Sequence, residues 1–201
     1  RPPSGAEPPD HASPTPPPRL LTSPPRGLTR EALTRARRNI WMTHAYFIPD
    51  PDFVEALSAA AARGVDVKIL VPRTSNHVVA DWISRGYFGQ LQAAGVQIHR
   101  FEGAMVHAKT ATVDGNWSTV GTANIDRLSM TGNYEINVEF IDPGMAKVME
   151  AVFVSDLDQA SYLSPPDWNA LGLHRPLTEG LSRPLRHLLL APTPRRTQCL
   201  Y

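Results

Sequence analysis

The sequence contains little cysteine and no long apolar run. Cys199 is the only cysteine among 201 residues, which excludes an internal disulfide and any metal site built from several cysteines. No stretch of about 18 apolar residues occurs, so no segment of this sequence is expected to span a bilayer. The motif H-E-x-x-H and carboxylates at metal-ligand spacing are also missing, which is consistent with a site that needs neither a metal nor another cofactor.

Basic charge is scarce in the middle of the chain. Residues 39–173 contain 8 Lys and Arg against 15 Asp and Glu, a net charge of −7, whereas residues 1–38 and 174–201 each carry +4. A protein that coats nucleic acid needs clustered basic side chains that displace counterions, so we do not favour a nucleic-acid partner. Basic ends of this kind are more often solvated, although they also suit the anionic headgroups of a membrane surface.

Proline is concentrated at the two ends, where residues 1–28 and 164–201 hold 16 of the 20 prolines. A Pro-rich segment cannot build a packed core of its own, so we expect a disordered segment over 1–28 and a Pro/Arg-rich tail over 164–201. The folded domain is then expected over residues 29–163. The sequence begins with Arg and shows no signal peptide, which suggests a fragment of a longer polypeptide or an incomplete reading frame.

The middle of the chain alternates between strand and helix patterns. Short β-branched runs bounded by proline or glycine indicate strands, and the pair Asp50-Pro51 indicates the start of a helix. The predicted strands span 40–47, 65–71, 96–101, 105–113, 117–124 and 134–141, and the predicted helices span 29–38, 51–62, 78–94 and 145–160. The first three strands alternate with helices and should be parallel, whereas Asp114-Gly115-Asn116 predicts a tight turn between the next two. The fold class is therefore α/β, a mixed sheet with helices on both faces.

One stretch concentrates residues that suit phosphate chemistry. It contains, in order, His107, Lys109, Asp114, Gly121, Thr122, Asn124 and Glu135. Residues two apart on a strand share a face, so His107 and Lys109 should project together, and so should Thr122 and Asn124 on the next strand. An imidazole, an ammonium, a hydroxyl and an amide would then surround one phosphate. Glu135 on the third strand could fix the tautomer of His107 and stabilise its imidazolium form.

Each of these residues also has a structural interpretation. A lone histidine in a strand is usually structural, but several elements at fixed spacing make coincidence improbable here. Asp114 either takes part in the chemistry or simply belongs to its turn, paired with backbone or a basic residue. His77 either lines a cleft at a strand end or is a surface loop residue. Tyr46 and Phe47 either border a lipid or glycerol group or belong to the core.

The stretch resembles the HKD motif of the phospholipase D superfamily, H-x-K-x₄-D-x₆-G-[ST]-x-N, and matches it without a gap. The resemblance covers roughly residues 30–160 and is strongest to the C-terminal half of bacterial cardiolipin synthases. It is carried by the segments 45–50 (AYFIPD), 63–72 (RGVDVKILVP), 87–95 (YFGQLQAAG), 124–126 (NID) and 133–135 (NYE). A phospholipase-D-like version of the mixed sheet is therefore expected.

What the resemblance implies is a two-step transfer. One histidine attacks phosphorus and forms a phosphohistidine, and another protonates the leaving oxygen before it activates the acceptor. By resemblance, His107, Lys109, Asp114 and Glu135 are the catalytic candidates, and Lys109, Thr122 and Asn124 bind the phosphate without a metal. The implied substrate is a phosphatidylglycerol-like phospholipid, and the implied location is the cytoplasmic membrane surface, with peripheral attachment.

The sequence departs from the family in one respect, because a complete site takes two HKD motifs and this chain has one. A second HKD half in a longer chain would complete it. Alternatively, two copies could pair as a homodimeric single-motif nuclease or phosphodiesterase, or the chain could be an incomplete, inactive half. The choice between phosphatidyl transfer and hydrolysis also stays open, because it depends on cleft geometry and water exclusion.

Overall fold

The structure is a computed structural model of the 201-residue chain, and it describes residues 26–73, 78–103, 106–123, 125 and 136–164. The Pro-rich segment expected over 1–28 and the tail expected over 164–201 fall almost wholly outside these residues. None of the helices within the described ranges is both long and apolar enough to cross a membrane.

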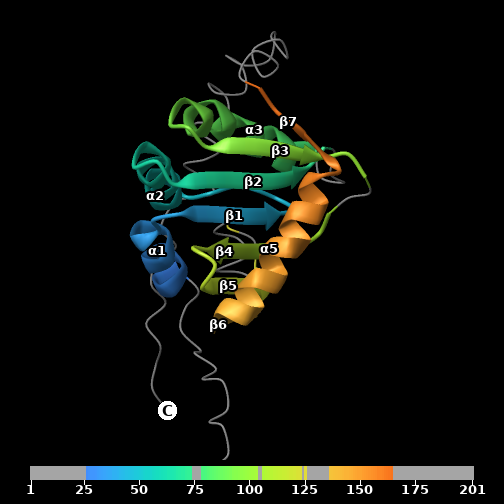
Figure 1. Ribbon diagram of the computed structural model, residues 1–201. Coiled ribbons are helices and arrows are strands. Elements are labelled where there is room, and N and C mark those ends of the chain that lie inside the picture. Colours follow the sequence, from blue (N-terminus) through green and yellow to red (C-terminus); the bar gives the residue numbers. More distant parts are fainter. Residues whose placement is uncertain (1–25, 74–77, 104–105, 124, 126–135, 165–201) are drawn as a thin grey trace, which may run out of the picture.

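The described residues form a mixed sheet of seven strands in the order β6-β5-β4-β1-β2-β3-β7 (Figure 1). The strands are β1 (Asn39–His44), β2 (Asp66–Pro72), β3 (Gln97–Phe101), β4 (Lys109–Val113), β5 (Trp117–Gly121), β6 (Asn137–Ile141) and β7 (Ala160–Tyr162). β1, β2 and β3 run parallel, and every other neighbouring pair is antiparallel. The predicted mixed α/β sheet is confirmed.

Helices cover both faces of this sheet. One face is crossed by α5 (Pro143–Leu157). The other three helices lie away from α5, and they are α1 (Arg26–Arg35), α2 (Pro51–Ala62) and α3 (Val78–Ala93) (Figure 1). The Asp50 side chain caps α2 by accepting from the Phe53 N–H at 2.9 Å, with Pro51 in the first turn, as the sequence predicted. Asp142 caps α5 in the same way through the Met145 N–H.

Strand alternation separates two layers of side chains. Ile40 and Met42 of β1 are fully buried in the main hydrophobic core, together with Leu57 of α2. Trp41, between them in sequence, points to the other face and stacks on Phe153 of α5, with ring centroids 5.4 Å apart. Because successive residues of a strand face opposite sides, β1 contributes to both layers.

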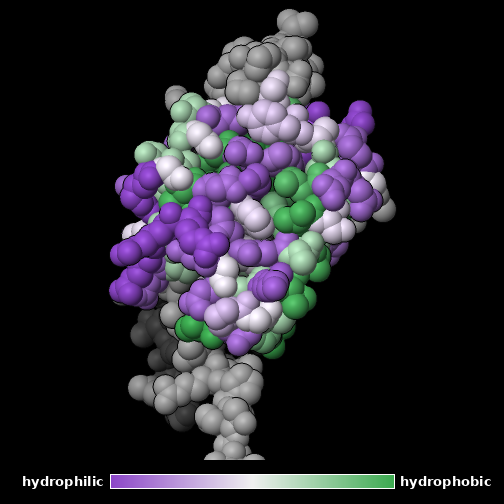
Figure 2. All heavy atoms as spheres, viewed as in Figure 1, coloured by the Kyte–Doolittle hydropathy of each residue, from purple (hydrophilic) through white to green (hydrophobic). Residues whose placement is uncertain are grey.

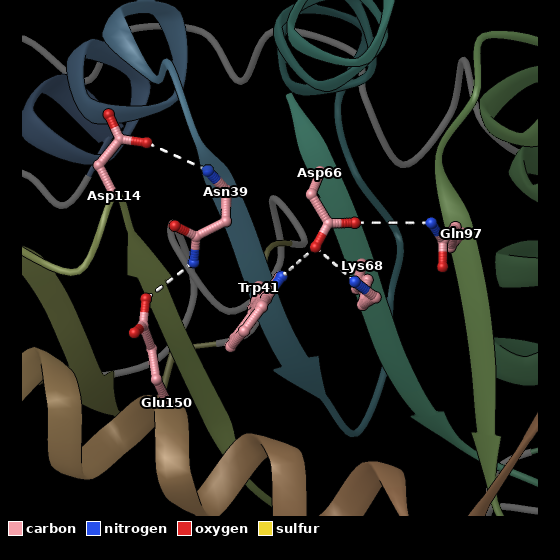
Figure 3. A network of polar contacts seen from close by, with 7 residues as sticks. All are labelled: Asn39, Trp41, Asp66, Lys68, Gln97, Asp114 and Glu150. Carbon is pink, nitrogen blue, oxygen red and sulfur yellow. Dashed lines mark hydrogen bonds and ion pairs between the residues drawn. The ribbon is translucent and has the colours of Figure 1, made fainter. Parts of the chain in front are cut away.

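A chain of polar contacts runs under α5 (Figure 3). Asp66 of β2 accepts from the Trp41 indole at 2.9 Å, from Lys68 and, at 3.5 Å, from Gln97. Lys68 also lies 5.3 Å from the centre of the Trp41 ring. The carboxylate and the cation therefore satisfy one another in the partly buried layer, which is the condition for placing charge there.

The outer surface of α5 is less polar than a solvent-facing helix normally is. Val148, Val152 and Val154 are 58%, 53% and 44% exposed. In Figure 2 hydrophobic side chains gather along the line of α5, among more hydrophilic surroundings. α5 is therefore apolar both where it meets the sheet and on part of the side that faces away.

Several predicted boundaries are wrong. β4 begins at Lys109 rather than at residue 105, because its partner β1 ends at His44 and offers no ladder beyond it. β5 ends at Gly121 rather than at 124, and β6 begins at Asn137 rather than at 134. β7 was not predicted, since its three residues are too few for an alternation to be read, and the predicted last helix ran to 160 instead of ending at Leu157.

The turn after β4 is as predicted. Val113 pairs with Trp117, and the Asn116 N–H donates to the Val113 carbonyl at 3.1 Å. Asp114 and Gly115 have φ values of 55° and 64°. Two consecutive positive φ angles define the type I′ turn, whose twist matches that of a hairpin, and Asp-Gly is among the pairs that tolerate it.

Candidate functional site

His107 and Lys109 meet at the beginning of β4. The Lys109 ammonium lies 3.0 Å from Nδ1 and 3.3 Å from Nε2 of His107, and it donates to the His107 carbonyl at 2.9 Å. An ammonium only donates, so it can bond to whichever ring nitrogen of His107 carries no proton. The two side chains that the sequence placed on one face are thus together, although His107 itself precedes the strand.

The two side chains differ sharply in exposure. His107 is exposed, whereas Lys109 is only 6% exposed. Because a buried ammonium is costly, it is stable only where acceptors surround it. A negative group that arrived at the exposed imidazole would therefore meet a cation held in place from below.

His44 lies next to Lys109, and sequence reasoning did not select it. The antiparallel register of β1 and β4 pairs His44 with Lys109 directly. His44 is 5% exposed and its Nδ1 has no hydrogen-bond partner. Burial, and secondarily the charge of Lys109, lowers the His44 pKa to about 3. His44 is therefore neutral at physiological pH, and the only sequence signal for it was its place at the end of a strand.

Tyr46 and Phe47 follow His44 and have separate roles. Phe47 is 1% exposed and belongs to the core. Tyr46 is half-buried and sets its ring edge-on to His107, with centroids 6.0 Å apart and planes 82° apart. Of the two aromatic residues, Tyr46 therefore borders the candidate site, whereas Phe47 is part of the core.

Thr122 joins the ends of β5 and β6. Its hydroxyl accepts from the Ile136 N–H at 3.0 Å and lies 3.4 Å from the Ile136 carbonyl, and the side chain is exposed. Asn137 accepts from the Ala123 N–H at 3.2 Å, directly beside Gly121. A Cβ at Gly121 would collide with the Asn137 amide and the Ile136 carbonyl, so this position requires glycine for close approach.

Asp114 lies at the opposite end of β4 from Lys109. Its carboxylate accepts from three consecutive backbone N–H groups: Arg37 at 2.9 Å, Arg38 at 2.7 Å and Asn39 at 3.2 Å. Figure 3 shows it beside Asn39, whose amide donates to Glu150 of α5 at 2.8 Å. The Asp114 contacts tie the turn after β4 to the segment between α1 and β1 and to the first residue of β1, and they support the structural interpretation of Asp114.

Three predicted or discussed site residues, Asn124, Glu135 and His77, lie outside the described residues. Glu139, further along β6, is described and is half-buried. Burial raises its pKa above the usual range, against hydrogen bonds from Trp117 and Thr29 that lower it. Within the described ranges, no group of three or more His, Cys, Asp and Glu side chains has the geometry of a metal site.

Comparison with known families decides what this arrangement belongs to. Residues 29–157 match the family described as "Cardiolipin synthase, PLD-like domain". The chain belongs to this family. The matched range begins in α1 and ends in α5, so it contains His107, Lys109 and every strand of the sheet except β7.

Curated relatives support the same assignment. Cardiolipin synthase A of Edwardsiella ictaluri is 40% identical over 146 residues, which cover 73% of this chain and 29% of the relative. Cardiolipin synthase A of Yersinia pseudotuberculosis is 39% identical over 150 residues, covering 75% and 31%. The chain therefore spans less than a third of the length of these relatives.

Solved structures share the fold. A phospholipase D family member from Salmonella typhimurium, Nuc, aligns with a TM-score of 0.58 and 26% identity, covering 68% of this chain and 89% of that one. Phosphatidylserine synthase of Haemophilus influenzae also aligns with a TM-score of 0.58, at 11% identity, and supports the fold alone. The expected phospholipase-D-like version of the mixed sheet is confirmed.

Proposed function

We propose that this chain is one half of an enzyme that transfers a phosphatidyl group between phospholipids, as a cardiolipin synthase does, through a phosphohistidine at His107. The observation that carries the proposal is the contact of the exposed His107 imidazole with the buried Lys109 ammonium. Membership of the cardiolipin synthase PLD-like family supports it. The proposed substrate is a phosphatidylglycerol-like lipid.

In the first step a ring nitrogen of His107 attacks phosphorus, and the bond from phosphorus to the headgroup oxygen breaks. That oxygen leaves with a proton supplied by a second imidazole. In the second step the acceptor hydroxyl returns a proton to that imidazole, its oxygen attacks phosphorus, and the phosphorus–nitrogen bond breaks. Lys109 stabilises the negative charge on the non-bridging oxygens in both transition states, and Asn124 and Thr122 are proposed as further donors.

The second imidazole is proposed to come from another HKD half. Glu135 is proposed to orient His107, and His44 is unsuited to proton transfer because it is buried and stays neutral down to about pH 3. The chain spans 29% and 31% of two cardiolipin synthase relatives, which leaves room in such a protein for a preceding half. We infer that the complete enzyme places the two halves face to face at the reacting phosphate.

One observation favours a second candidate, a homodimeric phosphodiesterase or nuclease. This chain covers 89% of Nuc, a phospholipase D family member of comparable extent. A two-fold axis through the site would bring two copies of His107 and Lys109 together. The net charge of −7 over residues 39–173 disfavours nucleic acid as the substrate of such a dimer.

Peripheral attachment to the cytoplasmic membrane surface is part of the proposal. The substrate is a bilayer lipid, and the two basic ends, at +4 each, suit anionic headgroups. With water as acceptor in place of a lipid hydroxyl, the same phosphohistidine would give hydrolysis. Exclusion of water from the cleft therefore decides between the two products.

Trapping the covalent intermediate tests the proposal. Phosphatidylglycerol with a labelled phosphate is mixed with the chain, alone and in its longest natural reading frame, and the reaction is quenched in alkali. We expect a phosphatidyl adduct on the peptide containing His107, and none in His107→Asn. Turnover without such an adduct, or an adduct on another residue, would contradict it. Light scattering during size exclusion then separates an active dimer from a two-motif monomer.

A further inference from the structure

A concave site lies at the carboxyl ends of the parallel strands, with Ala45 and Phe47 after β1 on one side. It is a small hollow of about 60 Å³, open to solvent. Its apolar lining includes Phe47, Val71, Phe88 and Leu163. Its polar lining is strongly basic, since it includes three arginines, Arg73, Arg85 and Arg100. A hollow of this volume has room for a few water-sized groups, and so for a phosphate rather than for a whole lipid.

Arg100 is the most buried of the three arginines. It pairs with Val71 in the β2–β3 register and so shares the face of the buried Ile98. Its Nε is buried and has no hydrogen-bond partner. Within the described ranges neither Arg100 nor Arg85 forms an ion pair, whereas Arg73 binds Glu102 at 2.6 Å. A buried donor without a partner is costly, and a ligand that accepts from it removes that cost.

The surrounding charge favours an anion. Glu102 is a carboxylate that interacts electrostatically with Arg73 and Arg100, and it is engaged by Arg73 and by Ser161. These two contacts, Ser161 first, hold the pKa of Glu102 below its usual range, so it is ionised and already occupied. One carboxylate against three guanidinium groups leaves the hollow positive. Guanidinium groups suit phosphate because they present two parallel donors.

A backbone hydrogen bond connects the lining of the hollow to the strand that carries the candidate catalytic site. Ala45 lines the hollow, and its N–H donates at 3.2 Å to the carbonyl of Ala108, between His107 and Lys109. Tyr46 follows and touches His107 with its ring. Three strand spacings separate β3 from β4, or roughly 14 Å between backbones, and long side chains extend into that interval from both sides.

We propose that this arginine hollow, with Arg100 at its centre and Arg85 at its mouth, binds the phosphate of a second glycerophospholipid, the acceptor in the transfer. Its phosphate contacts the guanidinium groups in the hollow, its glycerol and hydrocarbon extend out of the hollow, and its free hydroxyl reaches toward the phosphorus held at His107. This inference rests on the proposed function for its role, and the binding itself can be measured without turnover. Such a site favours transfer over hydrolysis, because it positions a lipid hydroxyl where water would otherwise attack.

Calorimetry with the 201-residue chain tests the site. The probe is dihexanoylphosphatidylglycerol below its micelle concentration, with inorganic phosphate as a second ligand. Arg100→Gln should weaken lipid binding by roughly tenfold or more, because it removes a charge-assisted contact. Arg85→Gln, on the exposed surface of α3, should weaken it less and leaves the packing of the sheet alone. Arg35→Gln is the matched control, with the same charge change at the opposite end of β1, and should alter binding less than about twofold.

Equal losses in Arg100→Gln, Arg85→Gln and Arg35→Gln would overturn the proposal, because the attraction would then be general electrostatics. Inorganic phosphate that binds as tightly as the lipid would also overturn it, and would indicate a free-phosphate site. Circular dichroism confirms folding, and if Arg100→Gln fails to fold, Arg85→Gln alone decides. Binding that depends on the arginines while no adduct forms on His107 would support the hollow and sink the proposed chemistry. The reverse result would remove only the hollow.

Discussion

Lys109 and Asp114 lie at the two ends of β4, only five positions or roughly 16 Å of strand apart. Their surroundings are nevertheless opposite in kind. At the Asp114 end the polar groups are hydrogen-bonded to one another, since one carboxylate accepts from three backbone N–H groups. At the Lys109 end a buried ammonium faces an exposed imidazole, and the neighbouring His44 Nδ1 has no partner. One end of the strand is built for stability, and the other keeps polar groups available for a ligand.

Substitution of His107 tests this difference between the two ends most directly. His107→Gln should lower turnover of phosphatidylglycerol by at least about 10³-fold in the active assembly, because a nucleophile or general acid is lost. The melting temperature should shift by less than about 2 °C, because the side chain is exposed. His99→Gln is the matched control and should keep activity within about threefold. Turnover within about tenfold of the parent would remove His107 from the mechanism.

A methyl group at Gly121 should disturb the Lys109 end by crowding alone. Gly121→Ala places Cβ against the Asn137 amide and the Ile136 carbonyl, which we expect to cost about 3 kcal/mol in the free energy of unfolding. Urea unfolding measures this. Gly144→Ala, at the start of α5, is the control and should change stability by less than about 1 kcal/mol. Equal effects of the two substitutions would show that the Gly121 contact is not tight.

Asp114 should matter for stability rather than for chemistry. Asp114→Ala leaves three backbone N–H groups without their carboxylate and should lower the free energy of unfolding by about 2 kcal/mol. Asp114→Asn keeps one acceptor oxygen and tolerates the φ of 55°, so it should cost less. Turnover well below the melting temperature should stay within about threefold for both. A folded Asp114→Ala protein that lost activity like His107→Gln would instead give Asp114 a direct chemical role.

A change in the pH dependence of stability is expected from His44. Its pKa is about 3 in the folded chain and near 6.5 when unfolded, so between these values the unfolded state binds more protons. Stability is therefore complete above about pH 6.5 and falls as the pH falls, by up to about 1.4 kcal/mol per unit. His44→Leu should show a shallower slope in urea unfolding at pH 5, 6 and 7. Parallel profiles for the two proteins would contradict the burial of a neutral His44.

The local signals in the sequence were sufficient for several elements. Asp50-Pro51 marked the start of α2, Asp114-Gly115 marked the hairpin turn, and short apolar runs marked β1 to β3. The spacing of His107 and Lys109 also placed them together, because residues two positions apart in an extended chain project to the same side. These features depend on backbone geometry over a few residues, which is why a sequence read alone contains them.

What only the tertiary structure decided is which distant residues meet. The antiparallel pairing of β1 with β4 placed His44 against Lys109, and the same pairing set Asp114 against the N–H groups of residues 37–39. Arg73, Arg85 and Arg100 come from three elements and meet only because parallel strands end at one edge of the sheet. The sequence determined the strands and the motif by short-range geometry. Strand order and register, fixed by the burial of both sheet faces, determined the surroundings of that motif.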